Sequence, residues 1–188
     1  MALPEGTRGI APASARLALA GGLAVVVASA VYAVGRVHTP DYTMGLFGRS
    51  GAGAIRLKAQ LATVILVLAA AQLGLALWMY RRLPGAGAAP RPVPVLHRLA
   101  GATLFLLSLP VAAQCVLAYG VDLSGPRVAA HSLAGCFFYG AFAAKVLIVR
   151  SRRLPRWGLP VAGGLLVMLI VVLWYSAALW YFAGFQLP

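Results

Sequence analysis

The sequence predicts an all-α fold, in which a single integral membrane domain over residues 1–188 forms a bundle of five transmembrane helices. The composition is 62% hydrophobic and only 10% charged, whereas soluble domains carry about 25% charged residues. Five apolar runs reach the roughly 20 residues that a membrane-spanning helix needs. The basic residues gather between these runs, as they do in membrane proteins. We therefore expect a multi-pass protein of the cell membrane, surrounded by the lipid bilayer.

The spans are expected in chain order at about 17–35, 59–80, 99–119, 128–149 and 159–183. The first resembles a signal peptide, because Ala28-Ser29-Ala30 imitates a cleavage site. Its apolar run is longer than the roughly 7–15 residues of a signal core, so we expect a retained helix. Trp78 and Trp157 stand at span ends, where aromatic side chains favour the headgroup level.

The connections differ in charge and in length. Ten basic residues fall on one side of the membrane and five on the other. The ten are Arg8, Arg16, Arg81, Arg82, Arg91, Arg98, Arg150, Arg152, Arg153 and Arg156. The positive-inside rule then predicts a cytoplasmic N-terminus and an outer C-terminus. The outer loop 36–58 is half apolar, and it is either an interfacial or re-entrant piece or a linker on the membrane. We expect no nucleic acid partner, because the basic residues lie between apolar runs.

Two similar strings each open an apolar span: His97-Arg98-Leu99-Ala100-Gly101 and His131-Ser132-Leu133-Ala134-Gly135. Residues four apart share a face of a helix, so each histidine stands beside a glycine. An imidazole beside such a bare patch could face a flat ring. An ionisable side chain in lipid is a functional candidate by default.

Depth in the membrane decides which residues could share a site. His97 and His131 would lie at opposite faces, roughly 25 Å apart at 1.5 Å per residue, so one iron cannot bind both. His38 matches His131 in depth, and this pair could ligate a haem iron or copper. Gly135 would leave room for the ring, and Gln114 could hydrogen-bond a ligand.

At the inner face, His97 and Gly101 lie near a second possible site with Lys145. Lys145 could contact a haem propionate, donate in a quinone site or ligate iron, or it could reach the headgroups. Simpler interpretations stay open for the others: His97 could meet lipid phosphate, and His131 could hydrogen-bond a neighbouring helix. The glycines could serve only close helix packing.

The run from Lys58 to Trp180 resembles a family of small actinobacterial membrane proteins known only as a domain of unknown function. The resemblance rests on His38-Thr-Pro-Asp-Tyr, His97-Arg98-x-x-Gly101 and the segment from His131 to Lys145. It implies an integral membrane fold. The opening His-Arg-x-x-Gly also resembles b-type cytochromes of the cytochrome b561 and ferric reductase kind, in which paired histidines bind haem.

These observations together predict a membrane-embedded electron-transfer protein that holds b-type haem, or a subunit of a quinol-linked respiratory complex. His131 and His38 are the expected outer ligands, and His97 lies near a possible inner site. Its partners would be other membrane or periplasmic electron-transfer subunits, with quinone as a further candidate ligand. The alternative is a subunit without cofactor that packs against a larger membrane complex through its glycine-rich faces. No motif of nucleophilic or nucleotide-dependent catalysis occurs. The sequence therefore assigns no catalytic residue and leaves open whether the chain is an enzyme.

Overall fold

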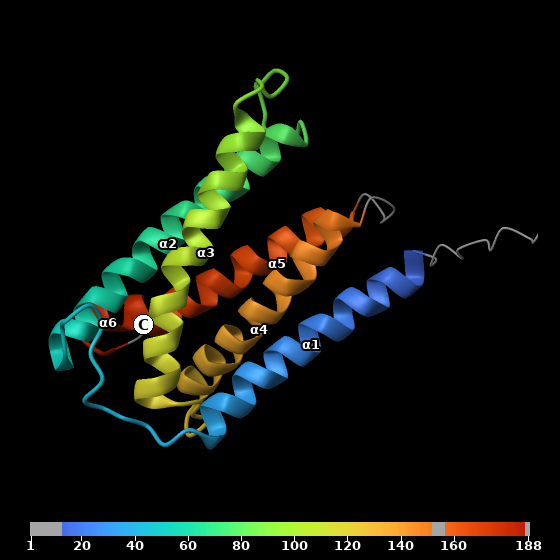
Figure 1. Ribbon diagram of the computed structural model, residues 1–188. Helices are drawn as coiled ribbons and strands as arrows, with labels where there is room; N and C mark the ends of the chain where they lie inside the picture. Colours follow the sequence, from blue (N-terminus) through green and yellow to red (C-terminus); the bar gives the residue numbers. More distant parts are fainter. Residues whose placement is uncertain (1–12, 152–156, 187–188) are drawn as a thin grey trace, which may run out of the picture.

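The computed structural model describes residues 13–151 and 157–186 (Figure 1). The helices are α1 (Ala13–Val37), α2 (Gly51–Met79), α3 (Val93–Tyr119), α4 (Pro126–Arg150), α5 (Gly158–Leu173), η1 (Trp174–Leu179) and α6 (Trp180–Phe182). The last three run on as one span, in which η1 is a π-helical segment. These ranges contain no β-strand, and five helices are long and apolar enough to cross a membrane. The predicted all-helical, multi-pass architecture is confirmed at this level.

Two helices begin earlier than the sequence predicts. Helix α2 begins at Gly51 rather than near residue 59. The glycine and alanine residues that follow Ser50 form its first turn. Helix α3 begins at Val93 rather than near 99, and Pro94 suits its first turn, where no amide donor is needed. The connections are therefore residues 38–50, here loop 1, and residues 80–92, here loop 2. The ends of the bundle are named after them.

Loop 1 is a compact turn rather than a re-entrant helix. The Leu46 and Arg49 amides each donate to the other residue's carbonyl. The turn between them places Phe47 and Gly48 at positive φ, which glycine adopts without strain. Loop 1 is fastened to α3, because the Asp41 amide donates to the Leu117 carbonyl at 3.1 Å.

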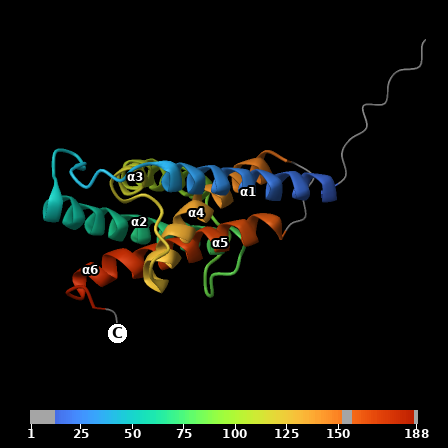
Figure 2. The same ribbon diagram turned by 90° about the horizontal axis from the view of Figure 1, so that it is seen from below.

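The helices form two groups that meet at the loop-1 end. Helix α1 packs on α4 and α4 on α5, while α2 packs on α3 and also reaches α5 and η1. In Figure 1 the α2–α3 pair and the α1–α4–α5 group come together near loop 1 and separate toward loop 2. Figure 2 shows α1 and α5 on opposite sides of α4. The bundle is thus closed at one end and spread at the other.

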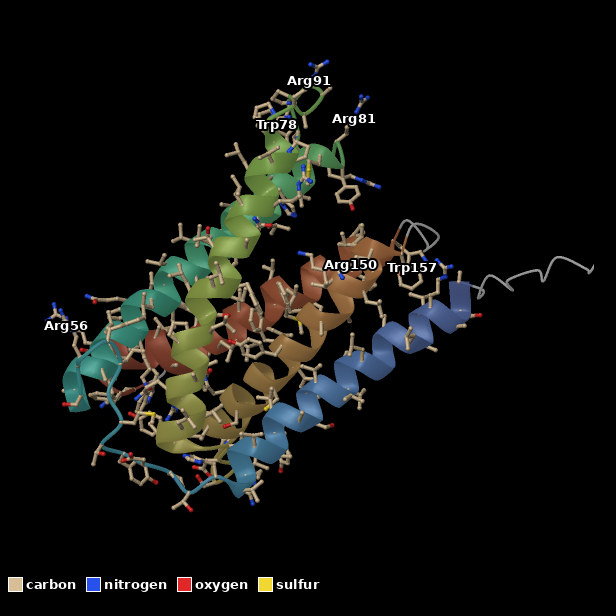
Figure 3. All side chains as sticks on the ribbon, viewed as in Figure 1. Arg56, Trp78, Arg81, Arg91, Arg150 and Trp157 are labelled. Atoms are coloured by element: carbon tan, nitrogen blue, oxygen red, sulfur yellow. The ribbon has the colours of Figure 1, made fainter. Side chains whose placement is uncertain are left out.

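In α2 and α4, burial decreases in the same direction, from loop 1 toward loop 2. The main core joins Ile65 and Ala69 of α2, Leu104 of α3, Phe138 of α4 and Leu166 of α5. In α2 past Gln72 and in α4 past Ala141, toward loop 2, no residue is buried, whereas Val93 of α3 and Gly158 of α5 are buried at that end. The two separated tips carry basic and aromatic residues: Trp78, Arg81 and Arg91 on one, Arg150 and Trp157 on the other (Figure 3). Both tips therefore suit one membrane face, where such residues meet headgroups.

Candidate functional site

At the loop-1 end, His131 is held by the last span. Its Nδ1 lies 3.0 Å from Ser176 Oγ, and that hydroxyl donates to the Val172 carbonyl at 2.6 Å. Because a hydroxyl has one proton to give, the His131 Nδ1–H is the donor to Ser176 Oγ. This assigns the lone pair of the neutral ring to Nε2. The interhelical hydrogen bond expected as the simpler interpretation of His131 is therefore present.

His38 is held elsewhere at the same end. Its Nε2 donates to the Leu117 carbonyl of α3 at 3.0 Å, while His131 bonds to η1. Within the described ranges no group of three or more His, Cys, Asp or Glu side chains could hold a metal. A metal or haem shared by His38 and His131 stays a prediction; while Nε2 donates to Leu117, His38 would have to ligate through Nδ1.

Gln114 fastens loop 1 instead of a histidine. Its side-chain nitrogen donates to the Met44 carbonyl at 3.0 Å, and its Oε1 is buried without a hydrogen-bond partner. Lys58 contacts the same end of α3. Its Nζ lies 3.9 Å from Cys115 Sγ and 4.2 Å from the centre of the Tyr119 ring. The sequence predicts Lys58 at the end of the outer loop 36–58. The early start of α2 places it in a helix, within electrostatic range of His131.

At the loop-2 end, His97 lies in the second turn of α3. Its Nδ1 is buried and has no hydrogen-bond partner. Lys145 of α4 lies within electrostatic range of the ring, and it is half-buried. The His97 carbonyl accepts a hydrogen bond from the Gln72 side chain of α2. Three helices from both groups thus place polar side chains here.

The two glycines expected to leave bare patches are covered. A Cβ on Gly101 would stand 3.4 Å from Gln72 Oε1, so Gln72 fills the space beside that glycine. A Cβ on Gly135 would stand 3.8 Å from a Leu173 methyl. Both glycines therefore serve contact between helices here. The sequence offered no signal for Gln72 or Ser176, because single polar residues in apolar runs have no spacing pattern.

Each helix-borne histidine thus has a lysine from another helix within electrostatic range: Lys145 for His97 and Lys58 for His131. None of the three acidic residues of the chain lies in a described helix. Because of this, neither histidine–lysine cluster has an anionic partner within the described helices. Buried charges are normally paired, so a bound anion would complete either cluster. The arrangement can supply a nitrogen ligand and a cation, which suits a ring cofactor that carries carboxylates.

The two acidic residues that the structure describes, Asp41 and Asp122, lie instead in connections at the loop-1 end. The Thr43 hydroxyl and amide both donate to Asp41, which lowers the pKa of its carboxyl group. Asp122 makes the same kind of turn with Ser124, and its pKa is lowered by the same two bonds. Both carboxylates stabilise turns and are not directed into the bundle.

The comparison with known families identifies the chain at a coarse level. A family described as a family of unknown function (DUF6529) matches residues 17–188. The chain belongs to this family. Its match covers nearly the whole chain, so the predicted resemblance to a domain of unknown function is confirmed, whereas nothing supports an actinobacterial origin or a likeness to cytochrome b561. No curated protein and no solved structure matches the chain.

Proposed function

We propose that this protein is a membrane electron-transfer protein that binds a b-type haem at the loop-2 end. The observation that carries the proposal is His97 Nδ1, a buried nitrogen without a partner, within a site that also contains Lys145. Imidazole nitrogen is an established axial ligand of haem iron. A bound b-type haem would supply a reversible one-electron carrier in the membrane.

Each residue of this site would have a separate role in binding the haem. His97 would hold the iron from α3, and Gln72 would fix that turn through the His97 carbonyl. The Lys145 ammonium would pair with a propionate carboxylate, because no acidic residue lies in the described helices to neutralise it. His97 and Lys145 belong to the two helix groups that separate toward this end (Figure 1), so the haem group would bind between α3 and α4.

The orientation of the chain belongs to the same proposal. Ten basic residues against five favour a cytoplasmic loop 2 and an outer C-terminus in the cell membrane. Four of the ten, Arg8, Arg152, Arg153 and Arg156, lie outside the described residues. In this orientation the haem would face the cytoplasmic leaflet. Quinol or a respiratory subunit would then exchange electrons with it.

The test is the reduced-minus-oxidised visible spectrum, with iron analysis, of protein purified in mild detergent after haem-replete expression. We expect a b-type band that His97→Ala removes. We expect Lys145→Met to keep the band and shift the midpoint potential, and Lys145→Arg to restore it. A colourless, iron-free wild type would overturn the proposal. Loss of the band in His131→Ala and His38→Ala, but not in His97→Ala, would place the haem at the loop-1 end instead.

A subunit without cofactor is the second candidate, and open glycine surfaces favour it. A Cβ added at Gly21 or Gly22 of α1, or at Gly163 or Gly164 of α5, would meet no atom within 4 Å. Exposed small residues let a further helix approach closely. Copurification of a colourless chain with respiratory subunits, abolished by Gly21→Leu with Gly22→Leu, would support this candidate.

A further inference from the structure

An apolar groove whose lining includes one arginine lies between α4 and the last span. Its volume is about 390 Å³, and its lining consists of Arg127, Ala130, Val171, Val172, Tyr175 and Ser176. Val171 and Tyr175 are exposed, so in a membrane span they face lipid. Arg127 is the only charged residue of this lining. It stands in the first turn of α4, at the loop-1 end.

The Arg127 side chain is fixed in place. One guanidinium nitrogen donates to the Ser176 carbonyl at 2.7 Å, and the guanidinium carbon lies 3.8 Å from the centre of the Trp180 ring. Ser176 belongs to the π-helical segment, and such segments often occur at functional sites. Arginine has five N–H donors, so most remain for a ligand. Within the described ranges Arg127 has no carboxylate partner.

We infer that this groove binds an anionic phospholipid, with the headgroup phosphate on Arg127 and an acyl chain along the apolar lining. Charge complementarity selects the occupant, because the guanidinium is fixed, lacks a counter-ion and matches phosphate bidentately. Basic sites between transmembrane helices bind anionic headgroups in this way. Trp180 and Tyr175 suit the headgroup level at which the site lies.

The test is native mass spectrometry of the full chain in detergent with added phosphatidylglycerol or phosphatidylcholine. We expect wild type to retain phosphatidylglycerol preferentially, and Arg127→Gln to weaken retention about fivefold, the effect of one basic residue near a membrane surface. Arg56→Gln is the matched control, because Arg56 lies at the same end and points away from the bundle (Figure 3). Equal retention of both lipids, or equal effects of the two variants, would overturn the inference.

A second variant keeps Arg127 and its hydrogen bond. Ala130→Leu fills the groove and should also reduce phosphatidylglycerol retention, whereas Ala33→Leu at a similar depth on α1 should not. Inorganic phosphate at the same phosphorus concentration distinguishes a free anion from a lipid. If phosphate displaces the lipid completely and Ala130→Leu has no effect, the site takes phosphate alone and the lipid assignment is wrong. Displacement by an isoprenoid quinone at lower concentration would likewise overturn it.

Discussion

The two ends of the bundle hold a histidine and a lysine in opposite ways. At the loop-1 end, His131 donates to Ser176 and the helix groups are in contact through α2 and η1. At the loop-2 end, His97 Nδ1 is buried without a partner, and the helix groups separate. The closed end therefore pairs its histidine with another helix, although Gln114 Oε1 stays unpartnered there, while the histidine of the open end has no partner for Nδ1. We therefore expect the closed end to contribute more to stability, and the proposed haem would bind at the open end.

The largest expected difference concerns close packing. Gly35 lies in the last turn of α1, where a Cβ would stand 2.5 Å from a Val121 methyl and 3.2 Å from the Val121 amide nitrogen. Gly35→Ala should lower the free energy of unfolding by about 1–3 kcal/mol, the usual cost of overpacking. Gly74 of α2, near the loop-2 end, has no atom within 4 Å of such a Cβ. Gly74→Ala should leave stability unchanged or raise it by up to about 1 kcal/mol.

Denaturant titration of detergent-solubilised protein, followed by helical circular dichroism, measures this pair. Both variants change one helical glycine to alanine, so they differ mainly in their surroundings. Equal destabilisation by the two would show that the loop-2 end is as tightly packed as the loop-1 end.

The helices could be predicted from sequence because hydrophobicity alone determines what crosses a membrane. Their starts could not, because Gly51 and Val93 begin helices in segments too polar or too proline-rich to resemble spans. The wrong predicted start of α2 matters most for Lys58. This residue lies in helix α2 rather than in the outer loop, and only the backbone structure shows this.

The candidate site was predictable in part. Histidines and Lys145 stand out in an apolar chain, and their depth follows from helix rise. Their partners do not follow, because hydrogen bonds across helices depend on rotation about each helix axis. The π-helical segment that aims Ser176 at His131 has no sequence signature. The glycines beside the two histidines were expected to be bare, and Gln72 and Leu173 cover them.

The next effect tests whether the closed end can be made to resemble the open one. Ser176→Ala removes the acceptor of His131 Nδ1–H and leaves a nitrogen unpartnered, as in His97. Interhelical hydrogen bonds in membrane proteins contribute about 0.6 kcal/mol on average and up to about 1.7. We expect a loss of unfolding free energy within this range. Ser29→Ala on the exposed face of α1 is the matched control and should be silent. A silent Ser176→Ala would mean that this bond does not stabilise the closed end.

A smaller effect is expected when the histidines themselves are removed. In protein without haem, His97→Leu should change the free energy of unfolding by less than about 0.5 kcal/mol, because its ring nitrogen has no bond to lose. His131→Leu should cost more, because it removes the hydrogen bond between His131 Nδ1 and Ser176 Oγ. The same titration in haem-depleted protein compares them. A costly His97→Leu without cofactor would contradict the assignment of the open end to ligand binding.

The smallest effect concerns the carboxylate that orders loop 1 at the closed end. Two bonds from Thr43 lower the pKa of Asp41 in the folded state, so the ionised form is the stabilising one. Its contribution is complete above the unfolded pKa of about 3.9 and is lost as pH falls through the lower folded value. Hydrogen exchange of the Thr43 amide should therefore accelerate relative to Asp41→Asn only below about pH 4. Asp122→Asn changes the equivalent turn between α3 and α4 and should leave this amide unaffected.

Because the Asp41 amide also bonds to Leu117, a response that spreads from Thr43 to the His38 ring would show that loop 1 and the end of α3 open together. A response confined to Thr43 would show that the closed end holds even when its outermost turn is released.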